Sequence, residues 1–241
     1  MKQIKILSTR KLDVSLHAKA EEENFLLVEE NLIRTHFKKD QDTVDKILTA
    51  LNSGIKNIVF TSSNAVRALE LIMKQVHVEL KGKNIFSLSG KTKDAVEKAF
   101  ADNSIHAEAR NAEELAKVVI ADGVTEVIFI CGNKRRDTLP EILTAAGIQW
   151  TGIIVYDTEE SPKKMDEDFD AILFFSPSAV SSFFRYNEVS DSTVCFAIGE
   201  TTADSLREMK IENIVISPYP QEEKIFETLI NYYKKQENSS Q

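Results

Sequence analysis

Short apolar runs rich in β-branched or aromatic residues recur along the chain, and most are followed by a segment with helical periodicity. Several runs are apolar at every position, which is typical of strands in a parallel sheet that helices cover on both faces. The expected strands are 4–9, 25–33, 57–62, 84–89, 126–131, 150–156, 171–176, 193–198 and 213–217. This alternation predicts right-handed β-α-β units and therefore an α/β fold with parallel sheets.

Three segments between or after these runs place their apolar residues three and four positions apart, as an amphipathic helix does. Their apolar faces are Val66, Leu69, Ile72, Met73 and Val76; Leu139, Ile142, Leu143 and Ala146; and Ile225, Phe226, Leu229, Ile230 and Tyr233. Gly147 stands where it can end the second of these helices. Ligands of parallel sheets usually bind beyond the carboxyl ends of the strands, near helix N-termini, so candidate chemistry is sought there.

The chain contains an internal repeat. NIVFTSSNAVRAL (57–69) resembles AILFFSPSAVSSF (171–183), and NIFSLSGKTKDAVEKA (84–99) resembles VCFAIGETTADSLREM (194–209) in the same order. Any two strand-turn-helix units look somewhat alike, but two matches in the same order favour a duplication. The repeat therefore predicts two similar lobes.

Two stretches, around 31–39 and 149–164, are extended and mix polar with apolar residues without forming a helical face. Ser161 and Pro162, with charged residues on both sides, fit an exposed crossing between lobes. Two lobes joined by two crossings would leave a cleft whose walls can open and close.

The composition and charge of the chain argue against nucleic acids and membranes as partners. The 241 residues are 42% hydrophobic, which is enough for a real core, and the formal net charge is −8. This acidic balance argues against nucleic-acid binding, which needs clustered Lys and Arg, but permits a small acidic ligand held by local dipoles. No segment approaches the roughly 18 apolar residues of a membrane span, and the first residues contain too short an apolar stretch for a signal peptide. We therefore expect a cytoplasmic protein without a membrane partner.

The sequence carries no motif for a metal or a cofactor. Cys131 and Cys195 do not form a CxxC pair, and the four histidines lack metal-ligand spacing. The chain has neither the GxxxxGK[ST] pattern of a nucleotide-binding loop nor a GxSxG nucleophile elbow. It is expected to need no metal and no cofactor.

Three turns between a strand and a helix are rich in hydroxyl groups, at 61–64, 176–178 and 199–202. Free backbone N–H groups and the positive end of the helix dipole attract carboxylates or phosphates at such turns. Ser and Thr are also ordinary N-caps whatever the function. Because the turns recur at matching places in the repeat, anion binding and plain capping both remain open.

Two further features admit two interpretations each. The run Lys134, Arg135 and Arg136 follows an apolar strand, and it could clamp an anion or form a solvated turn that pairs with Asp137 and Glu141. Tyr156 stands near the end of an expected strand, where it could pack or could donate a proton to a ligand.

Taken together, several motifs resemble one family. They are STR at 8–10, VFTSSNAV, CGNKRRDTLPEILTAAGI followed by VYDT, FFSPSAV, and FAIGETTADSL, and they resemble the uroporphyrinogen-III synthases of tetrapyrrole and heme biosynthesis. The resemblance implies two flavodoxin-like lobes with parallel sheets, joined by a two-stranded connector, with the active site between the lobes. Mapped onto this chain, the lobes are 1–32 plus 165–241 and 39–148, and the connectors are 33–38 and 149–164.

The resemblance also implies a reaction. A cofactor-free, monomeric hydro-lyase would take hydroxymethylbilane, a linear tetrapyrrole with eight carboxylates, and expel its terminal hydroxyl as water. The product, uroporphyrinogen III, would form through a spiro intermediate that inverts ring D, and the cationic intermediate would need shielding from water. Tyr156 matches the tyrosine proposed to assist departure of the hydroxyl. The implied substrate-binding residues are Arg10, Ser62, Ser63, Ser176, Ser178, Thr201 and Thr202.

Two other classes of protein compete with this interpretation. A two-lobed binding protein that closes on an acidic small molecule would share the hydroxyl-rich turns but would have no need of Tyr156. A tandem scaffold for a partner protein would carry a large exposed apolar patch instead. Formation of the type III product from hydroxymethylbilane would separate the enzyme from both.

Overall fold

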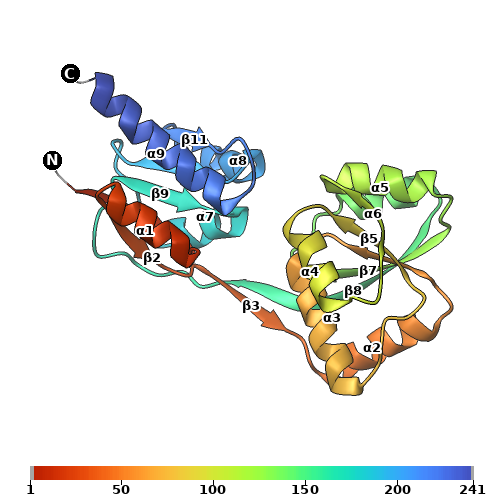
Figure 1. The fold of residues 1–241 in the computed structure, drawn as a ribbon. Coiled ribbons are helices and arrows are strands. Elements are labelled where there is room, and N and C mark those ends of the chain that lie inside the picture. Colours follow the sequence, from red (N-terminus) through yellow and green to blue (C-terminus); the bar gives the residue numbers. More distant parts are fainter. Residues whose placement is uncertain (1–2, 240–241) are drawn as a thin grey trace. The chain divides into compact units, whose positions relative to one another are not determined.

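A computed structural model describes residues 3–239. In it the chain folds into two compact units. Unit 1 comprises the residues up to Arg34 and those from Glu159 onward, and unit 2 comprises Thr35–Thr158. Figure 1 shows that each unit is a sheet with helices packed against it. The α/β class with parallel sheets, expected from the sequence, is confirmed.

The sheet of unit 1 has five strands, all parallel to their neighbours, in the order β11-β10-β9-β1-β2. The strands are β1 (Ile4–Ser8), β2 (Phe25–Glu29), β9 (Ala171–Phe174), β10 (Val194–Ala197) and β11 (Ile214–Ile216). Numbered along the chain within the unit, the order is that of flavodoxin-like sheets, with the second strand at one edge.

Helices cover both faces of this sheet. On one face lie α1 (Val14–Glu22) and α9 (Glu222–Ser239), and on the other lie α7 (Pro177–Phe184) and α8 (Glu200–Glu208). The central strands β9 and β10 are buried at every position, which explains why they are apolar throughout.

The sheet of unit 2 has six strands in the order β3-β8-β7-β4-β5-β6. They are β3 (Ile33–Phe37), β4 (Asn57–Phe60), β5 (Asn84–Leu88), β6 (Ile105–Ala109), β7 (Glu126–Gly132) and β8 (Gln149–Glu160). All the pairs from β8 to β6 are parallel. On one face of this sheet lie α2 (Gln41–Asn52), α3 (Ser63–Val76) and α4 (Lys91–Ala99), and on the other lie α5 (Ala112–Ala121) and α6 (Thr138–Ala145).

The internal repeat occupies equivalent positions in the two sheets. The units superimpose in topology when β4, β5, β6, β7 and β8 are matched with β9, β10, β11, β1 and β2. The repeated segments are then β4-α3 with β9-α7 and β5-α4 with β10-α8. Unit 1 is therefore a circular permutation of unit 2, because the chain enters unit 1 at β1, which matches β7, the fourth of the five matched strands of unit 2.

The structure differs from the expected elements at two edge strands. The run expected as one strand over 25–33 ends at Glu29, and a separate strand, β3, begins at Ile33. The strand β6 lies outside the expected set, because IHAEA mixes short and polar residues at the edge of the sheet, where one side meets solvent. The residues expected as connectors lie largely in β3 and β8, and β8 pairs with β7 over most of its length.

The strands β3 and β8 run in opposite directions. The Lys38 N–H donates to the Val155 carbonyl at 2.9 Å, and the Ser161 N–H donates to the Leu32 carbonyl at 2.8 Å. Since the later residue of one strand pairs with the earlier residue of the other, the pairing is antiparallel. It places Tyr156 beside a strand on each edge of β8.

Candidate active site

The strand order of unit 2 reverses between β4 and β7, because the chain moves outward to opposite edges of the sheet from these two strands. Ligands of such sheets bind beyond the carboxyl ends of the strands at this point. Three features of the sequence meet this edge: the Ser62 turn after β4, Gly132 and Asn133 at the end of β7, and Tyr156 on β8.

Ser62 is the N-cap of α3. It has extended backbone angles, and its Oγ accepts a hydrogen bond from the Asn64 N–H at 3.2 Å, which satisfies one of the free donors of the first turn. The same Oγ accepts a hydrogen bond from the Tyr156 hydroxyl at 3.0 Å. The structure thus brings together two predicted site residues that are 94 positions apart in the sequence. Ser63, the first residue of α3, is half-buried beside them.

Tyr156 is half-buried, and its ring lies against the backbone of Gly132. A Cβ atom at Gly132 would lie only 2.4 Å from the phenol ring, so any other residue there would displace it. Burial raises the pKa of Tyr156 above its ordinary value, while the hydrogen bond to Ser62 acts in the opposite direction. The phenol therefore keeps its proton at neutral pH.

The equivalent edge of unit 1 lies at the ends of β9 and β1. Ser176 is the N-cap of α7, and its Oγ accepts from the Ala179 N–H at 3.2 Å; Ser178 lies in the first turn of the same helix. Arg10 follows β1, and its guanidinium carbon lies 4.2 Å from the centre of the Phe175 ring, immediately before Ser176.

Arg10 has a carboxylate partner within its own unit. Its Nη2 forms an ion pair with Glu222, a carboxylate at the start of α9 that is only 7% exposed and also accepts from the Asp13 N–H. Burial lowers the pKa of Arg10, and Glu222 opposes this shift by stabilising the cation. The guanidinium of Arg10, which is expected to contact the substrate, therefore already pairs with a carboxylate of the protein itself.

The third hydroxyl-rich turn begins α8. Gly199 occupies the N-cap position, where no side chain accepts from the first turn of the helix. Thr201 is exposed, whereas Thr202 is only 3% exposed and its N–H donates to the Gly199 carbonyl. Of these two residues, Thr201 has the side chain that solvent reaches.

The basic run after β7 contains one arginine that packs against the protein and one that is exposed to solvent. The Arg135 guanidinium lies 5.7 Å from the centre of the Trp150 ring and 3.7 Å from the Asp137 carboxylate, while Arg136 is exposed. For Arg135 the structure favours the turn that pairs with Asp137 over the anion clamp.

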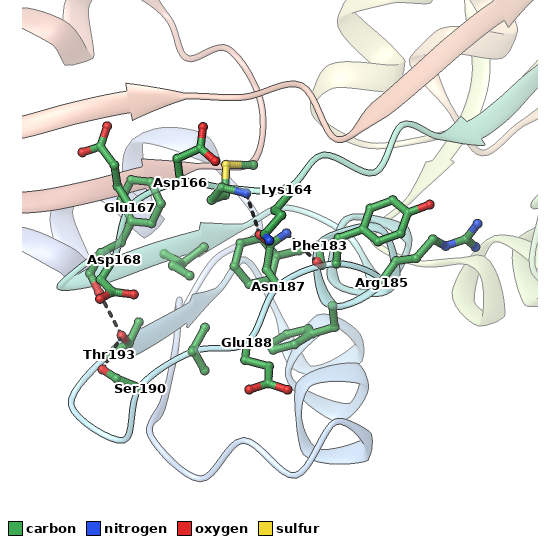
Figure 2. Close-up of a pocket in the computed structure, with 16 residues that line it drawn as sticks. Lys164, Asp166, Glu167, Asp168, Phe183, Arg185, Asn187, Glu188, Ser190 and Thr193 are labelled. Carbon is green, nitrogen blue, oxygen red and sulfur yellow. Dashed lines mark hydrogen bonds between the residues drawn. The ribbon is translucent and has the colours of Figure 1, made fainter.

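A cavity of about 540 Å³ lies elsewhere in unit 1 (Figure 2). Its walls are the segments 164–169 and 183–190, which precede β9 and β10, so it lies at the amino ends of the strands and away from Ser176. Within it, Asn187 accepts from the Met165 N–H and donates to the Phe183 carbonyl, so its amide maintains the local loop.

Residues 3–239 contain no group of three or more His, Cys, Asp or Glu side chains arranged to hold a metal ion. No helix within this range has the length and apolar character that crossing a membrane requires. Both cysteines are free and buried, and burial raises the pKa of Cys131 to about 11 and that of Cys195 to about 12.

Comparison with known proteins assigns the family. The family model described as uroporphyrinogen-III synthase HemD matches residues 14–227. The chain belongs to the uroporphyrinogen-III synthase family. Uroporphyrinogen-III synthase from Saccharomyces cerevisiae is 25% identical, over 93% of this chain and 92% of that protein. The resemblance inferred from the motifs is confirmed.

Solved structures of this family share the fold. A mutant uroporphyrinogen III synthase from Thermus thermophilus gives a TM-score of 0.69 at 18% identity, covering 98% of this chain and 99% of that one. The uroporphyrinogen-III synthetase from Helicobacter pylori gives 0.64 at 18% identity, covering 95% and 99%. At this level of identity the likeness concerns the fold alone.

Three residues of these edges were not singled out from the sequence: Gly132, Asn133 and Glu222. Gly132 and Asn133 do stand inside the CGN motif, so a glycine followed by an amide at a strand end was an available signal. Glu222 is 212 positions from Arg10 and carries no local signal, since it begins a helix like many other glutamates.

Proposed function

We propose that the protein cyclises hydroxymethylbilane to uroporphyrinogen III, the type III product, with loss of water and inversion of ring D, which makes it a hydro-lyase. Membership of the family supports this proposal. The single observation that carries it in the structure is the pair formed by the Tyr156 phenol and Ser62 at the carboxyl edge of the sheet of unit 2.

Tyr156 is the proposed proton donor. The phenol of a tyrosine whose pKa is raised is protonated at neutral pH, and it can give its proton to the departing hydroxyl as the carbon–oxygen bond breaks. Water then leaves, and the substrate becomes a cation whose electrophilic carbon is attacked by the substituted position of ring D. The phenolate regains a proton when ring closure releases one, so the cycle consumes nothing else. Ser62 holds the phenol at one position before the substrate arrives.

The substrate-binding groups are proposed to be the N-terminal turns of α3, α7 and α8. Helix N-termini present free N–H groups and partial positive charge, which suit the eight carboxylates of the substrate. The proposed side chains are Ser62 and Ser63 in unit 2 and Arg10, Ser176, Ser178, Thr201 and Thr202 in unit 1. Arg10 would supply full positive charge beside Ser176, although Glu222 shares its guanidinium.

Incubation with enzymatically generated hydroxymethylbilane, followed by chromatographic separation of the products, tests this function. Spontaneous closure gives the type I product, so type III above a heat-denatured control is the expected result. Only type I product, at the rate of that control, would contradict the proposal and would favour a non-catalytic protein that binds an acidic small molecule.

We further propose that the enzyme acts as a cytoplasmic monomer without metal or cofactor, with residues 1–32 and 165–241 as one domain and 39–148 as the other. The free thiols of Cys131 and Cys195 are typical of a reducing compartment. Exhaustive dialysis against a chelator should leave type III formation unchanged. Recovery of a lost activity by an added metal ion or coenzyme would contradict this part of the proposal.

A further inference from the structure

The strand that carries Tyr156 contains an irregularity directly before it. β7 and β8 pair residue by residue from Glu126 with Gln149 to Cys131 with Ile154, and then one residue of β8 is skipped, so that Gly132 pairs with Tyr156. Such a bulge adds one residue to one strand and redirects the side chains that follow it.

The bulge decides which face of the sheet receives the phenol. Side chains alternate between faces along a regular strand, so neighbours point in opposite directions. Ile153, Val155 and Tyr156 nevertheless all pack against the same hydrophobic cluster, on the face that carries α3. In an unbroken register Tyr156 would share the other face with Ile154, far from Ser62.

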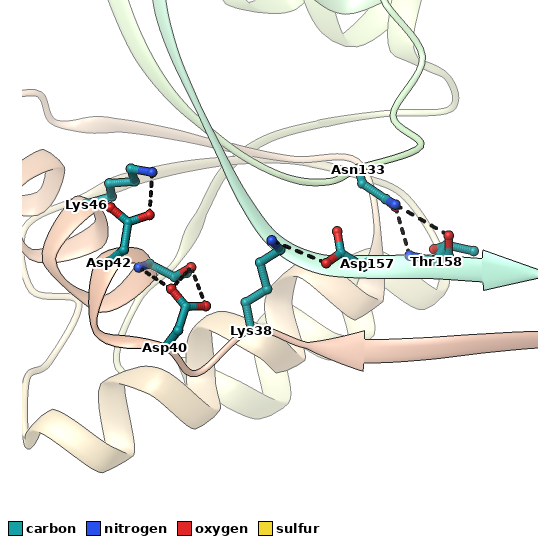
Figure 3. Close-up of polar contacts among 8 residues, drawn as sticks. Lys38, Asp40, Asp42, Lys46, Asn133, Asp157 and Thr158 are labelled. Atoms are coloured by element: carbon teal, nitrogen blue, oxygen red, sulfur yellow. Dashed lines mark hydrogen bonds and ion pairs between the residues drawn. The ribbon is translucent and has the colours of Figure 1, made fainter.

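A bulge interrupts the ladder of hydrogen bonds, and Asn133 restores it beyond this point. The Asn133 backbone N–H donates to the Tyr156 carbonyl at 3.1 Å. Its side-chain Oδ1 accepts from the Thr158 N–H at 2.8 Å, and its Nδ2 donates to the Thr158 carbonyl at 3.4 Å (Figure 3). The amide thus acts as one more strand residue beside β8.

The other edge of β8 is held by Lys38. Its N–H donates to the Val155 carbonyl at 2.9 Å, and its Nζ lies 3.2 Å from the Asp157 carboxylate (Figure 3). The residues before and after Tyr156 are therefore fixed from one side by Lys38, and Tyr156 and Thr158 are fixed from the other by Asn133.

We propose that Asn133 is a positioning residue for Tyr156: by pairing with Thr158 it fixes the bulged end of β8, so that the phenol reaches Ser62 Oγ. This inference rests on the proposed role of Tyr156 as proton donor. Asn133 acts through the strand and makes no contact with the reacting atoms. Gly132 completes the arrangement by leaving room for the ring.

Asn133→Ala removes both side-chain bonds to Thr158 and keeps the backbone N–H. The phenol then spreads over several positions, and we expect kcat to fall roughly 3–10-fold with KM almost unchanged, since a small misplacement of a catalytic group lowers the rate of the chemical step. Asn133→Asp keeps the acceptor for the Thr158 N–H and should restore most of the turnover.

Asn57→Ala is the matched control. Asn57 Nδ2 donates to the Glu126 carbonyl at 3.2 Å, so it also bonds the backbone of a neighbouring strand, but at the amino end of β7. Its loss should lower the melting temperature about as much as the loss of Asn133 and leave kcat unchanged.

Asn133→Ala should also be combined with Tyr156→Phe in a double variant. If Asn133 acts through the phenol, Asn133→Ala should cause no further fall in kcat once the hydroxyl is gone. An equal fall in the wild type and in the Phe background would overturn the inference, as would unchanged kcat in Asn133→Ala when Tyr156→Phe is impaired. Wild-type turnover in Tyr156→Phe would overturn the proton-donor role and this inference with it, while type III formation would still establish the cyclase.

Fluorine NMR gives a readout that does not depend on turnover. With 3-fluorotyrosine at position 156, Asn133→Ala should shift or broaden the resonance, and Asn57→Ala should leave it in place. An identical resonance in Asn133→Ala and wild type would show that the ring is held without Asn133 and would overturn the proposal even if no type III product formed.

Discussion

The two units build their carboxyl edges on the same strand order and on equivalent capping serines, yet different groups lie next to these serines. In unit 2 a neutral phenol, Tyr156, donates to Ser62. In unit 1 a cation, Arg10, lies on the ring of Phe175 immediately before Ser176, with Glu222 as its partner. A shared framework thus carries an uncharged hydrogen-bond donor in one copy and a charged pair in the other.

The difference originates in the edge strand of each copy. Tyr156 pairs with Gly132 at the end of β7, and the equivalent position in unit 1 is Glu29, which pairs with Ser8 at the end of β1. The Glu29 carboxylate accepts from the Leu12 N–H at 2.7 Å and lies 3.1 Å from a His17 nitrogen. The equivalent position in unit 1 therefore serves its own loop instead of holding a phenol against the capping serine.

The largest effect is expected at the phenol. Tyr156→Phe keeps the ring and its packing, and it should lower kcat roughly 10–100-fold, at the low end of what general-acid assistance contributes. The melting temperature should change little. Tyr233→Phe in unit 1 is the matched control, because that phenol donates to the Asp170 carbonyl at 3.2 Å; it should cost about 0.5–1.5 kcal/mol of stability and leave kcat unchanged. Equal turnover in both variants would return Tyr156 to a packing role.

Loss of the charged pair of unit 1 should lower the free energy of unfolding more than loss of a charged pair in unit 2. Arg10→Ala removes the guanidinium that pairs with buried Glu222 and should lower the free energy of unfolding by about 2 kcal/mol in urea titrations. Arg135→Ala in unit 2 removes a cation whose partner, Asp137, is exposed, and should cost about 1 kcal/mol or less. Adding Glu222→Gln to Arg10→Ala should recover part of the loss. Equal losses at Arg10 and Arg135 would contradict this contrast.

A side chain at position 132 should lower both stability and kcat, because Gly132 lies directly against the ring of Tyr156. Gly132→Ala forces the phenol ring away and should lower stability by about 1–2 kcal/mol, together with kcat, because the added methyl overpacks the site. Gly199→Ala in unit 1 adds the same methyl where no atom lies within 4 Å, on extended backbone, and should leave the melting temperature unchanged. A wild-type melting temperature for Gly132→Ala would show that the ring moves freely.

A smaller effect is expected at the hydroxyl-rich turns of unit 1. If Ser178 and Thr202 bind carboxylates, each Ala variant should lower kcat/KM only severalfold, since one neutral hydrogen bond typically contributes about 0.5–1.5 kcal/mol. The backbone N–H groups of α7 and α8 remain in both variants. Unchanged kinetics with a clear fall in melting temperature would instead give the two hydroxyls a purely structural role.

The effect of the buried thiols is confined to alkaline pH and is absent at the neutral pH at which the enzyme would be assayed. The pKa of Cys131 is raised to about 11, so between pH 9 and 11 the unfolded chain has lost a proton that the folded chain retains. The contribution of this thiol to stability is therefore complete below pH 9 and is lost as pH rises toward 11. For Cys195 the loss extends to about pH 12. Urea titrations of Cys131→Ala and wild type at pH 8 and 10.5 should show the wild type losing more stability.

The sequence by itself determined the class of fold and the positions of most strands. Strands such as β4 and β9 are buried on both faces, so they must be apolar throughout, and that pattern is visible locally. The capping serines and the glycine that ends α6 are also local, because a helix end needs its partners within a few residues. Repetition of these signals revealed the two copies, and the combined motifs revealed the family.

Only the tertiary structure decided which groups meet. The contact of Tyr156 with Ser62 depends on a bulge of one residue, and a shift of one residue moves a side chain to the other face of a sheet. Local periodicity does not encode such a shift, because Val155 and Tyr156 are both acceptable in a strand. The pairing of Arg10 with Glu222 likewise depends on where α9 begins against β1. Contacts between distant segments follow from strand order and register, which are fixed only when the whole unit packs.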